Sequence, residues 1–216
     1  NLLCQRRRPF VPRTTDSKHG WRVVANLARG LEVTSLDQLW VADITYVHLA
    51  EEFGYLAIVL DAFSRKVVGW AFEIHLRAEL AIAALEMAIT ARRPAPGSLI
   101  HHSDRGVQYA CGDYTAVLEA HDIQASMSRV GNPYDNAKAE SFMKTLKQEE
   151  VDGSAYRDVA DARARIGAFI ETVYNRQRLH SALDYLSPEE YEESARKLRR
   201  VVPPAARSTA ETCPRF

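Results

Sequence analysis

The sequence has few cysteines and no long apolar run, and both absences narrow what the protein can be. Cys4, Cys111 and Cys213 are isolated and odd in number, so neither a disulfide framework nor a CxxC zinc site is indicated. The longest apolar run, YLAIVLDAF, is interrupted by Asp61 and is far shorter than the roughly 20 residues of a transmembrane helix. No signal-peptide pattern stands at the start. We therefore expect a reducing, cytoplasmic setting with no membrane association.

The sequence also lacks net charge, with 28 Lys plus Arg against 28 Asp plus Glu, which by itself argues against a nucleic-acid partner. The distribution is uneven, however. Residues 1–30 carry seven basic side chains and one acidic one, whereas residues 31–62 carry six acidic side chains and no basic one. Such blocks are typical of solvated tails, but a basic arm beside a carboxylate-rich segment also suits a polyanionic substrate.

The length of 216 residues and the 46% hydrophobic content allow one domain with a real core and extensions. Residues 1–35 lack sustained periodicity and contain Pro9, Pro12 and Gly20, so we predict a basic arm or linker there. We predict a catalytic core over residues 36–180, a helical extension over 181–202 and a disordered tail over 203–216.

The hydrophobic pattern predicts an α/β fold. Three strand-like segments with short connections, over residues 38–49, 55–63 and 66–74, indicate an antiparallel meander. Helical and strand-like segments then alternate: helices over 77–93 and 112–122, strands over 97–103 and 123–128, which favours parallel addition to the same sheet. Helices follow around Glu140, over 158–178 with Val173 among the inward positions, and over 187–200 with Ser187 as N-cap.

Two aspartates lie at positions of the predicted sheet where a carboxylate could have a catalytic or ligand-binding role. Asp43 lies inside LWVADITYV, where a carboxylate is costly to bury unless it is paired, hydrogen-bonded or metal-bound, although it could also cap a turn or face water. Asp104 follows the apolar strand in LIHHSDRGVQY, and ligands tend to bind beyond the carboxyl ends of strands in open α/β sheets. The alternative for Asp104 is a turn-capping role through local hydrogen bonds.

Glu140 lies on the predicted helix that Asp135 or Asn136 could cap, about 110° around from its apolar stripe, which is Ala139, Phe142, Met143 and Leu146. Alone it resembles any solvated glutamate. Together, three carboxylates from a strand interior, a strand end and a helix could converge on one sheet edge. Hard oxygen ligands of this kind suit Mg²⁺ or Mn²⁺.

Several motifs in order, LWVADITYV, LDAFSRKVVGW, HHSDRGVQY, NPYDNAKAESFMKTLKQE, YNRQRLHSAL and LSPEEY, resemble the retroviral-integrase-like catalytic core of bacterial insertion-sequence transposases. The likeness is greatest to the insertion-sequence-3 family (OrfB type), of the DDE recombinase superfamily, and covers roughly residues 20–192. Asp104 and Glu140 are separated by 35 intervening residues, the D-35-E spacing of that family. The resemblance implies a ribonuclease-H-like fold with a mixed five-stranded sheet flanked by helices.

The resemblance further implies that Asp43, Asp104 and Glu140 are catalytic metal ligands holding two Mg²⁺ ions, with Mn²⁺ as a substitute. The expected activity is DNA cleavage that frees a 3′-hydroxyl, followed by strand transfer. The expected partners are DNA and at least one further copy of the chain, in a bacterial cytoplasm. Two alternatives stay open: a metal-dependent nuclease of the same fold without strand transfer, and an inactive DNA-binding or regulatory fragment of a decayed element.

Polar neighbours of the carboxylates are candidate DNA contacts. Lys144 and Lys147 share a helix face with Glu140 and could grip phosphates, or could merely offset its charge; Asn136 lies one turn before it. Tyr134, in the loop that the resemblance makes flexible, could stack on a base, unless this loop is a plain connector. Arg178 belongs to a basic cluster with Arg176 and His180 that could contact DNA or another subunit, or simply end a helix.

Other polar residues are assigned structural roles. His101 and His102 are neighbours in a strand and point to opposite faces, so both cannot serve one metal ion. Asp61 is the main rival carboxylate. Because its counterpart in the resembling family is a position outside the triad near a turn, we expect it to be structural.

Overall fold

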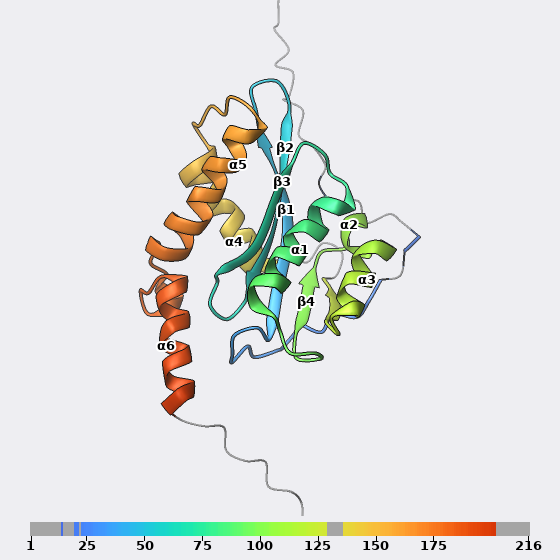
Figure 1. Ribbon diagram of the computed structural model, residues 1–216, viewed down its shortest axis with the longest axis vertical. Helices are drawn as coiled ribbons and strands as arrows, with labels where there is room; N and C mark the ends of the chain where they lie inside the picture. Colours follow the sequence, from blue (N-terminus) through green and yellow to red (C-terminus); the bar gives the residue numbers. More distant parts are fainter. Residues whose placement is uncertain (1–13, 15–19, 22, 129–135, 202–216) are drawn as a thin grey trace, which may run out of the picture.

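The computed structural model describes residues 14, 20–21, 23–128 and 136–201. Among these residues, five strands form one mixed sheet in the order β3-β2-β1-β4-β5 (Figure 1). The strands are β1 (Leu39–His48), β2 (Phe53–Asp61), β3 (Val67–Glu73), β4 (Ile100–Ser103) and β5 (Gln124–Met127). The first three pair antiparallel, whereas β4 and β5 join in parallel. The predicted meander with parallel additions is confirmed.

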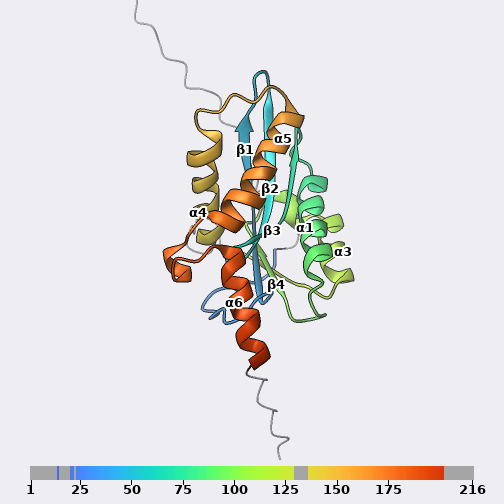
Figure 2. The same cartoon turned by 60° about the vertical axis from the view of Figure 1, so that its left-hand side comes forward.

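Helices cover both faces of the sheet. One face carries α1 (Ala78–Arg92) and α3 (Gly112–Ala120), and the other carries α4 (Ala137–Leu146) and α5 (Val159–Ala168), as both views show (Figures 1 and 2). A short helix, α2 (Val107–Ala110), precedes α3 and was not predicted. At 4 residues it is too short for helical periodicity to show in the sequence.

Alternation along β1 separates two apolar clusters. Leu39, Val41 and Val47 pack with α4 and α5, whereas Trp40 and Ala42 pack with α1 and α3. Because side chains alternate across a strand, Asp43 belongs to the α4 face. The central strand of the sheet therefore presents its carboxylate toward the helix that carries Glu140.

The predicted helix over residues 158–178 is two helices of different pitch. After α5 the chain forms a π-helix, η3 (Phe169–Gln177), in which the N–H of Arg178 donates to the carbonyl of Val173 at 2.8 Å. The wider π turn rotates the buried face. Tyr174 and Asn175 are consequently buried, whereas Val173 is 37% exposed and its prediction as an inward residue is wrong.

The last helix, α6 (Pro188–Val201), begins as the sequence predicts. Ser187 is its N-cap: its hydroxyl is 3.4 Å from the N–H of Glu190, and the Glu190 carboxylate accepts from the N–H of Ser187 at 2.9 Å. This reciprocal pair is a capping box. Glu192 on α6 is 2% exposed, so α6 packs on the core at this residue.

Parts of the predicted domain organisation lie outside the described residues. These are most of the arm over residues 1–35 and the whole tail over 203–216. The described part of the arm contacts the sheet, since the N–H of Leu27 donates to Ser126 Oγ at 2.8 Å. None of the helices that the structure describes is both long and apolar enough to span a bilayer.

Candidate active site

The register of the sheet places Asp43 and Asp104 side by side. Strands β1 and β4 pair in parallel, with Leu39 opposite Ile100 and Val41 opposite His102. If this register is continued by two residues beyond Val41 and His102, Asp43 comes to lie opposite Asp104. Asp104 directly follows the last residue of β4. Neighbouring strands lie about 4.8 Å apart. Two carboxylates far apart in the sequence thus come to one edge of the sheet.

Asp104 also shapes the turn that follows it. Its Oδ1 accepts a hydrogen bond from the N–H of Gly106 at 2.8 Å, just before α2 begins. A Cβ atom at Gly106 would lie 3.0 Å from both Asp104 Oδ1 and Gln108 Oε1, so glycine leaves room for these oxygens. The turn-capping role that the sequence left open is therefore present, and it orients the carboxylate at the end of β4.

Glu140 occupies the first turn of α4, and the four apolar residues of its helix are buried as predicted. Glu140 itself is exposed. It faces a cleft of about 490 Å³ that Asp43 also lines. The full lining is Asp43, Ile44, Thr45, Glu140, Met143, Lys144, Lys147, Gln148 and Asp152, so that Asp104 is not part of it.

The electrostatics of Asp43 reflect an excess of negative charge. Burial and the carboxylates of Asp104 and Glu140 together raise its pKa to about 7, against a hydrogen bond from the N–H of Ile44 at 2.8 Å and the charge of Lys147. Asp43 therefore senses both other members of the predicted triad. No group of three or more His, Cys, Asp or Glu side chains among the described residues is close enough to hold a metal ion as it stands.

The donor set fits a hard divalent cation in its chemistry. Three carboxylates supply only oxygen ligands, which Mg²⁺ and Mn²⁺ prefer, and the repulsion felt by Asp43 is what a cation would relieve. The carboxylates form a loose set: Asp43 lies inside β1, Asp104 directly follows β4, and Glu140 lies on α4. Coordination would require them to draw closer around an ion.

The two predicted lysines differ in their surroundings. Lys144 is exposed at the cleft, whereas Lys147 is partly buried, with its Nζ 4.7 Å from the ring centroid of Tyr46 on β1. This cation–π contact holds a positive charge near Asp43. Both lysines line the cleft, as their spacing from Glu140 predicts.

Two further predicted DNA contacts are Arg178 and Tyr134. Arg178 forms an ion pair with Glu149 of the π turn η2 (Lys147–Val151) and is not part of the cleft lining. Tyr134 lies outside the described residues, so its predicted contact stays a prediction.

Asn136 is placed differently from its prediction. It precedes α4 in the N-cap position, yet its side chain makes no capping bond. Instead it is buried, and its Nδ2 donates to the carbonyl of Ala42 at 3.1 Å. Asn136 thus does not cap the helix, and it is not a surface group in this structure.

The two histidines face different neighbours, as expected for adjacent residues in a strand. His101 Nε2 lies 3.0 Å from the hydroxyl of Tyr114 on α3, and His102 Nδ1 lies 2.8 Å from Ser126 Oγ on β5. Burial and the neighbouring His102 together lower the pKa of His101 to about 3. The hydrogen bonds of these two imidazoles support β4 and hence the position of Asp104.

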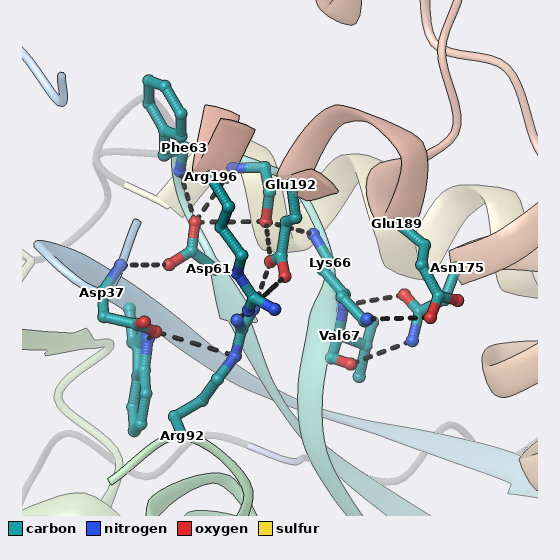
Figure 3. Close-up of polar contacts among 12 residues, drawn as sticks. Asp37, Asp61, Phe63, Lys66, Val67, Arg92, Asn175, Glu189, Glu192 and Arg196 are labelled. Atoms are coloured by element: carbon teal, nitrogen blue, oxygen red, sulfur yellow. Dashed lines mark hydrogen bonds and ion pairs between the residues drawn. The ribbon is translucent and has the colours of Figure 1, made fainter. Parts of the chain in front are cut away.

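Asp61 is structural, as expected. It is fully buried, and its carboxylate accepts from the N–H groups of Asp37, Phe63 and Ser64 at 2.7 to 2.9 Å and from the Ser64 hydroxyl at 3.2 Å. Figure 3 shows these bonds closing the turn after β2. Burial raises the pKa of Asp61, and the bonds from Ser64 and Asp37 oppose this shift.

Three cleft residues were missed by sequence reasoning: Thr45, Gln148 and Asp152. Thr45 follows Asp43 on the same face of β1, so the alternation could have indicated it. Asp152 comes to the cleft through η2, where its N–H bonds to the carbonyl of Lys147 at 2.6 Å, five residues back. No pattern in the sequence predicts such a π turn.

Comparison with known proteins places these observations in a family. The sequence matches models of the integrase core domain over residues 34–133 and 121–188. It is 42% identical over 193 residues to the insertion element IS600 uncharacterized 31 kDa protein of Shigella sonnei, covering 89% of this chain and 70% of that one. It is 41% identical over 181 residues to the transposase for insertion sequence element IS904 of Lactococcus lactis, covering 81% and 71%.

A third relative and two solved structures agree with this picture. Transposase InsF for insertion sequence IS3A of Escherichia coli is 42% identical over 192 residues, covering 88% of this chain and 66% of the relative. A chain of the simian T-cell lymphotropic virus intasome superposes with a TM-score of 0.63 at 16% identity, covering 94% and 68%. The HTLV-2 integrase catalytic core domain in complex with magnesium superposes with a TM-score of 0.55 at 13% identity, covering 79% and 99%. These superpositions confirm the ribonuclease-H-like fold.

Proposed function

This chain belongs to the insertion-sequence-3 family of transposases and carries its integrase core domain, and on that premise we propose that Asp43, Asp104 and Glu140 form its DNA-cleaving and strand-transfer site. The observation that carries the proposal is the register of β1 and β4, which sets the two aspartates side by side. Glu140 stands across the cleft from Asp43 on α4.

The three carboxylates would hold two Mg²⁺ ions, and Mn²⁺ would substitute. When bound, the ions would stabilise charge on the reacting phosphate and lower the pKa of the attacking oxygen. The protein contributes position: Asp43 lies inside the central strand β1, Asp104 directly follows β4, and Glu140 lies on a helix packed against the sheet. Lys144 and Lys147 would neutralise the phosphates that enter the cleft.

Two reactions follow at this site. In the first, a water oxygen bonds to a phosphorus at the transposon end and the bond to the 3′ oxygen breaks, leaving a 3′-hydroxyl and a 5′-phosphate. In the second, that 3′-hydroxyl bonds to a phosphorus of target DNA and releases a target 3′-hydroxyl. No covalent protein intermediate is needed, and positioning with charge neutralisation supplies most of the rate enhancement. The acting species would be at least a dimer on DNA in a bacterial cytoplasm.

The test uses labelled transposon-end DNA with Mg²⁺. Asp104→Asn and Glu140→Gln should each lose cleavage and joining by at least about a thousandfold while keeping the fold, because each removes a charge that neutralises the site's cation. Glu86→Gln, an exposed glutamate on α1 at the other face of the sheet, is the matched control and should retain wild-type rates. Joining at the wild-type rate by either site variant would contradict the assignment.

Product analysis separates the alternatives. Joined DNA is required for a transposase, whereas cleavage by the wild-type chain without any joined product would indicate a nuclease. A wild-type chain that binds DNA but neither cleaves nor joins it would indicate an inactive DNA-binding fragment.

A further inference from the structure

Asn136 makes a long-range contact that the proposed chemistry does not explain. Its side chain is 7% exposed, and its Nδ2 donates to the carbonyl of Ala42 at 3.1 Å, across 94 residues of sequence. A carbonyl oxygen can only accept, so the amide must turn its NH₂ toward Ala42. Its Oδ1 is then left buried without a hydrogen-bond partner among the described residues.

The carbonyl of Ala42 occupies a particular place in the sheet. The N–H of Ile100 donates to the carbonyl of Gln38 at 3.1 Å. In a parallel pair of strands these bonds recur at every second residue. Counting four residues along both strands from Gln38 and Ile100, the carbonyl of Ala42 is directed toward the N–H of Asp104. The paired residues of β1 and β4 end at Val41 and His102. The amide of Asn136 therefore bonds to β1 where the paired residues of the two strands end.

Asn136 is thereby linked to every segment that carries a carboxylate. It contacts the residue before Asp43, at the ladder position that faces Asp104, and it stands one helical turn before Glu140. We propose that Asn136 is a positioning residue that sets the spacing of the three carboxylates. The proposal rests on the function proposed above, and it replaces the direct DNA contact that the sequence suggested for this residue.

A second buried asparagine shows what a purely structural contact of this kind looks like. Asn175 accepts from the N–H of Val67 and donates to its carbonyl, each at 3.0 Å, so both ends of its amide are satisfied (Figure 3). Asn136 has one satisfied end and one buried acceptor without a partner. A buried acceptor without a partner is destabilising, so its presence at the cleft-bearing helix needs an explanation other than stability. This contrast favours a role at the site over a role in folding alone.

The experiment measures Mn²⁺ affinity of the DNA-free chain by calorimetry, together with kcat, KM for transposon-end DNA, and DNA affinity in EDTA. Asn136→Ala should weaken Mn²⁺ binding by about tenfold to a hundredfold and lower kcat similarly, because residues that orient ligands typically have effects of that size. KM and metal-free DNA affinity should stay within about twofold. Asn175→Ala is the matched control: it should lower the melting temperature and leave Mn²⁺ affinity unchanged.

Each outcome decides the matter. Unchanged Mn²⁺ affinity in a folded Asn136→Ala protein would overturn the proposal, and so would a loss of metal-free DNA affinity that matches the loss of activity. Should Asn136→Ala not fold, Asn136→Ser is measured in its place with the same expectations. A wild-type chain that binds Mn²⁺ but does not process DNA would contradict the proposed function, whereas wild-type activity with an unaffected Asn136→Ala variant would contradict only this inference.

Discussion

Two groups of carboxylates lie around the same sheet, and their electrostatic surroundings differ. At the start of β1 and the end of β2, Asp37, Asp61 and Glu192 are tied to Arg92, to Ser64 and to backbone N–H groups (Figure 3). Further along β1, Asp43 stands near Asp104 and Glu140, and burial and those two charges raise its pKa to about 7.

The difference is in the partners that the chain supplies. Arg92 reaches Glu192 and Asp37 from the end of α1, so the protein itself supplies ion-pair partners to the first group, and these contacts fasten α6 to the core. In the second group, two lysines line the cleft with Asp43 and Glu140, namely Lys144 and Lys147, and Lys147 is held over Tyr46. Paired carboxylates stabilise the fold, whereas burial and nearby negative charge destabilise the ionised form of Asp43, which is therefore suited to a cation that arrives from solution.

The largest expected effect is at the paired group. Glu192→Ala removes one side of a buried ion pair and leaves Arg92 short of a partner, which should lower the free energy of unfolding by about 3 to 5 kcal/mol. Urea denaturation measures it. Glu193→Ala, an exposed neighbour on α6, is the control and should change stability by less than about 0.5 kcal/mol. A loss below about 1 kcal/mol for Glu192→Ala would mean that the ion pair does not anchor α6.

Divalent metal should stabilise the protein through the second group. Saturating Mg²⁺ should raise the free energy of unfolding by about 1 to 3 kcal/mol, as expected for a ligand present at ten to a hundred times its Kd that binds only the folded chain. Thermal melts with and without EDTA measure the shift. The shift should vanish in Asp104→Asn and persist in Glu192→Ala. A shift of equal size in both variants would place the metal elsewhere.

Asp43→Asn should stabilise the metal-free protein while abolishing activity. The folded-state pKa of Asp43 is about 7 and its ordinary value is 3.8, so the stability that the protonated form provides is complete below pH 3.8 and is lost as pH rises to about 7. Asparagine mimics the protonated form. At about 1.4 kcal/mol for each pKa unit, we expect a gain of up to about 4 kcal/mol at pH 8 in EDTA that disappears near pH 4.

Asp61→Asn makes the opposite comparison on the neighbouring strand. Burial raises the pKa of Asp61 as well, but its two oxygens together accept four hydrogen bonds. In Asp61→Asn the NH₂ group would replace one of these oxygens and would face an N–H donor with which it cannot bond. This variant should lose stability at pH 8. A gain in both variants would show that burial alone, and not the missing partners, governs the site.

The smallest effect is expected at the rim of the cleft. Lys144→Ala should weaken binding of DNA by less than about tenfold and reduce the slope of log K against log salt by about 1, as for the loss of one phosphate contact. Lys66→Ala, whose ammonium lies 3.7 Å from Glu189, is the control and should leave the salt slope unchanged. Equal slopes for Lys144→Ala and the wild type would remove Lys144 from the DNA path.

Much of the fold follows from local patterns in the sequence. Alternation over residues 38–49 predicts β1, and Ser187 followed by Pro188 predicts the start of α6, because these signals depend on neighbours in sequence. The π-helix η3 could not be predicted, since its apolar spacing also fits an α-helix until packing buries Tyr174 in place of Val173. The contact of Asn136 could not be predicted either. An asparagine at this position suits a helix cap or a DNA contact, and its hydrogen bond to the carbonyl of Ala42 is seen only in the folded structure.

The sequence by itself determined the family, because its motifs and the spacing of Asp104 and Glu140 are those of that family, and through the family it predicts that three carboxylates belong together. It could not determine their electrostatic state. The electrostatic state depends on the register that sets Asp104 beside Asp43 and on the helix that brings Glu140 to the cleft. It also depends on Arg92, which pairs with Asp37 and Glu192. The pKa of a carboxylate is set by burial and by charges a few ångströms away, and the tertiary structure alone decides which charges those are.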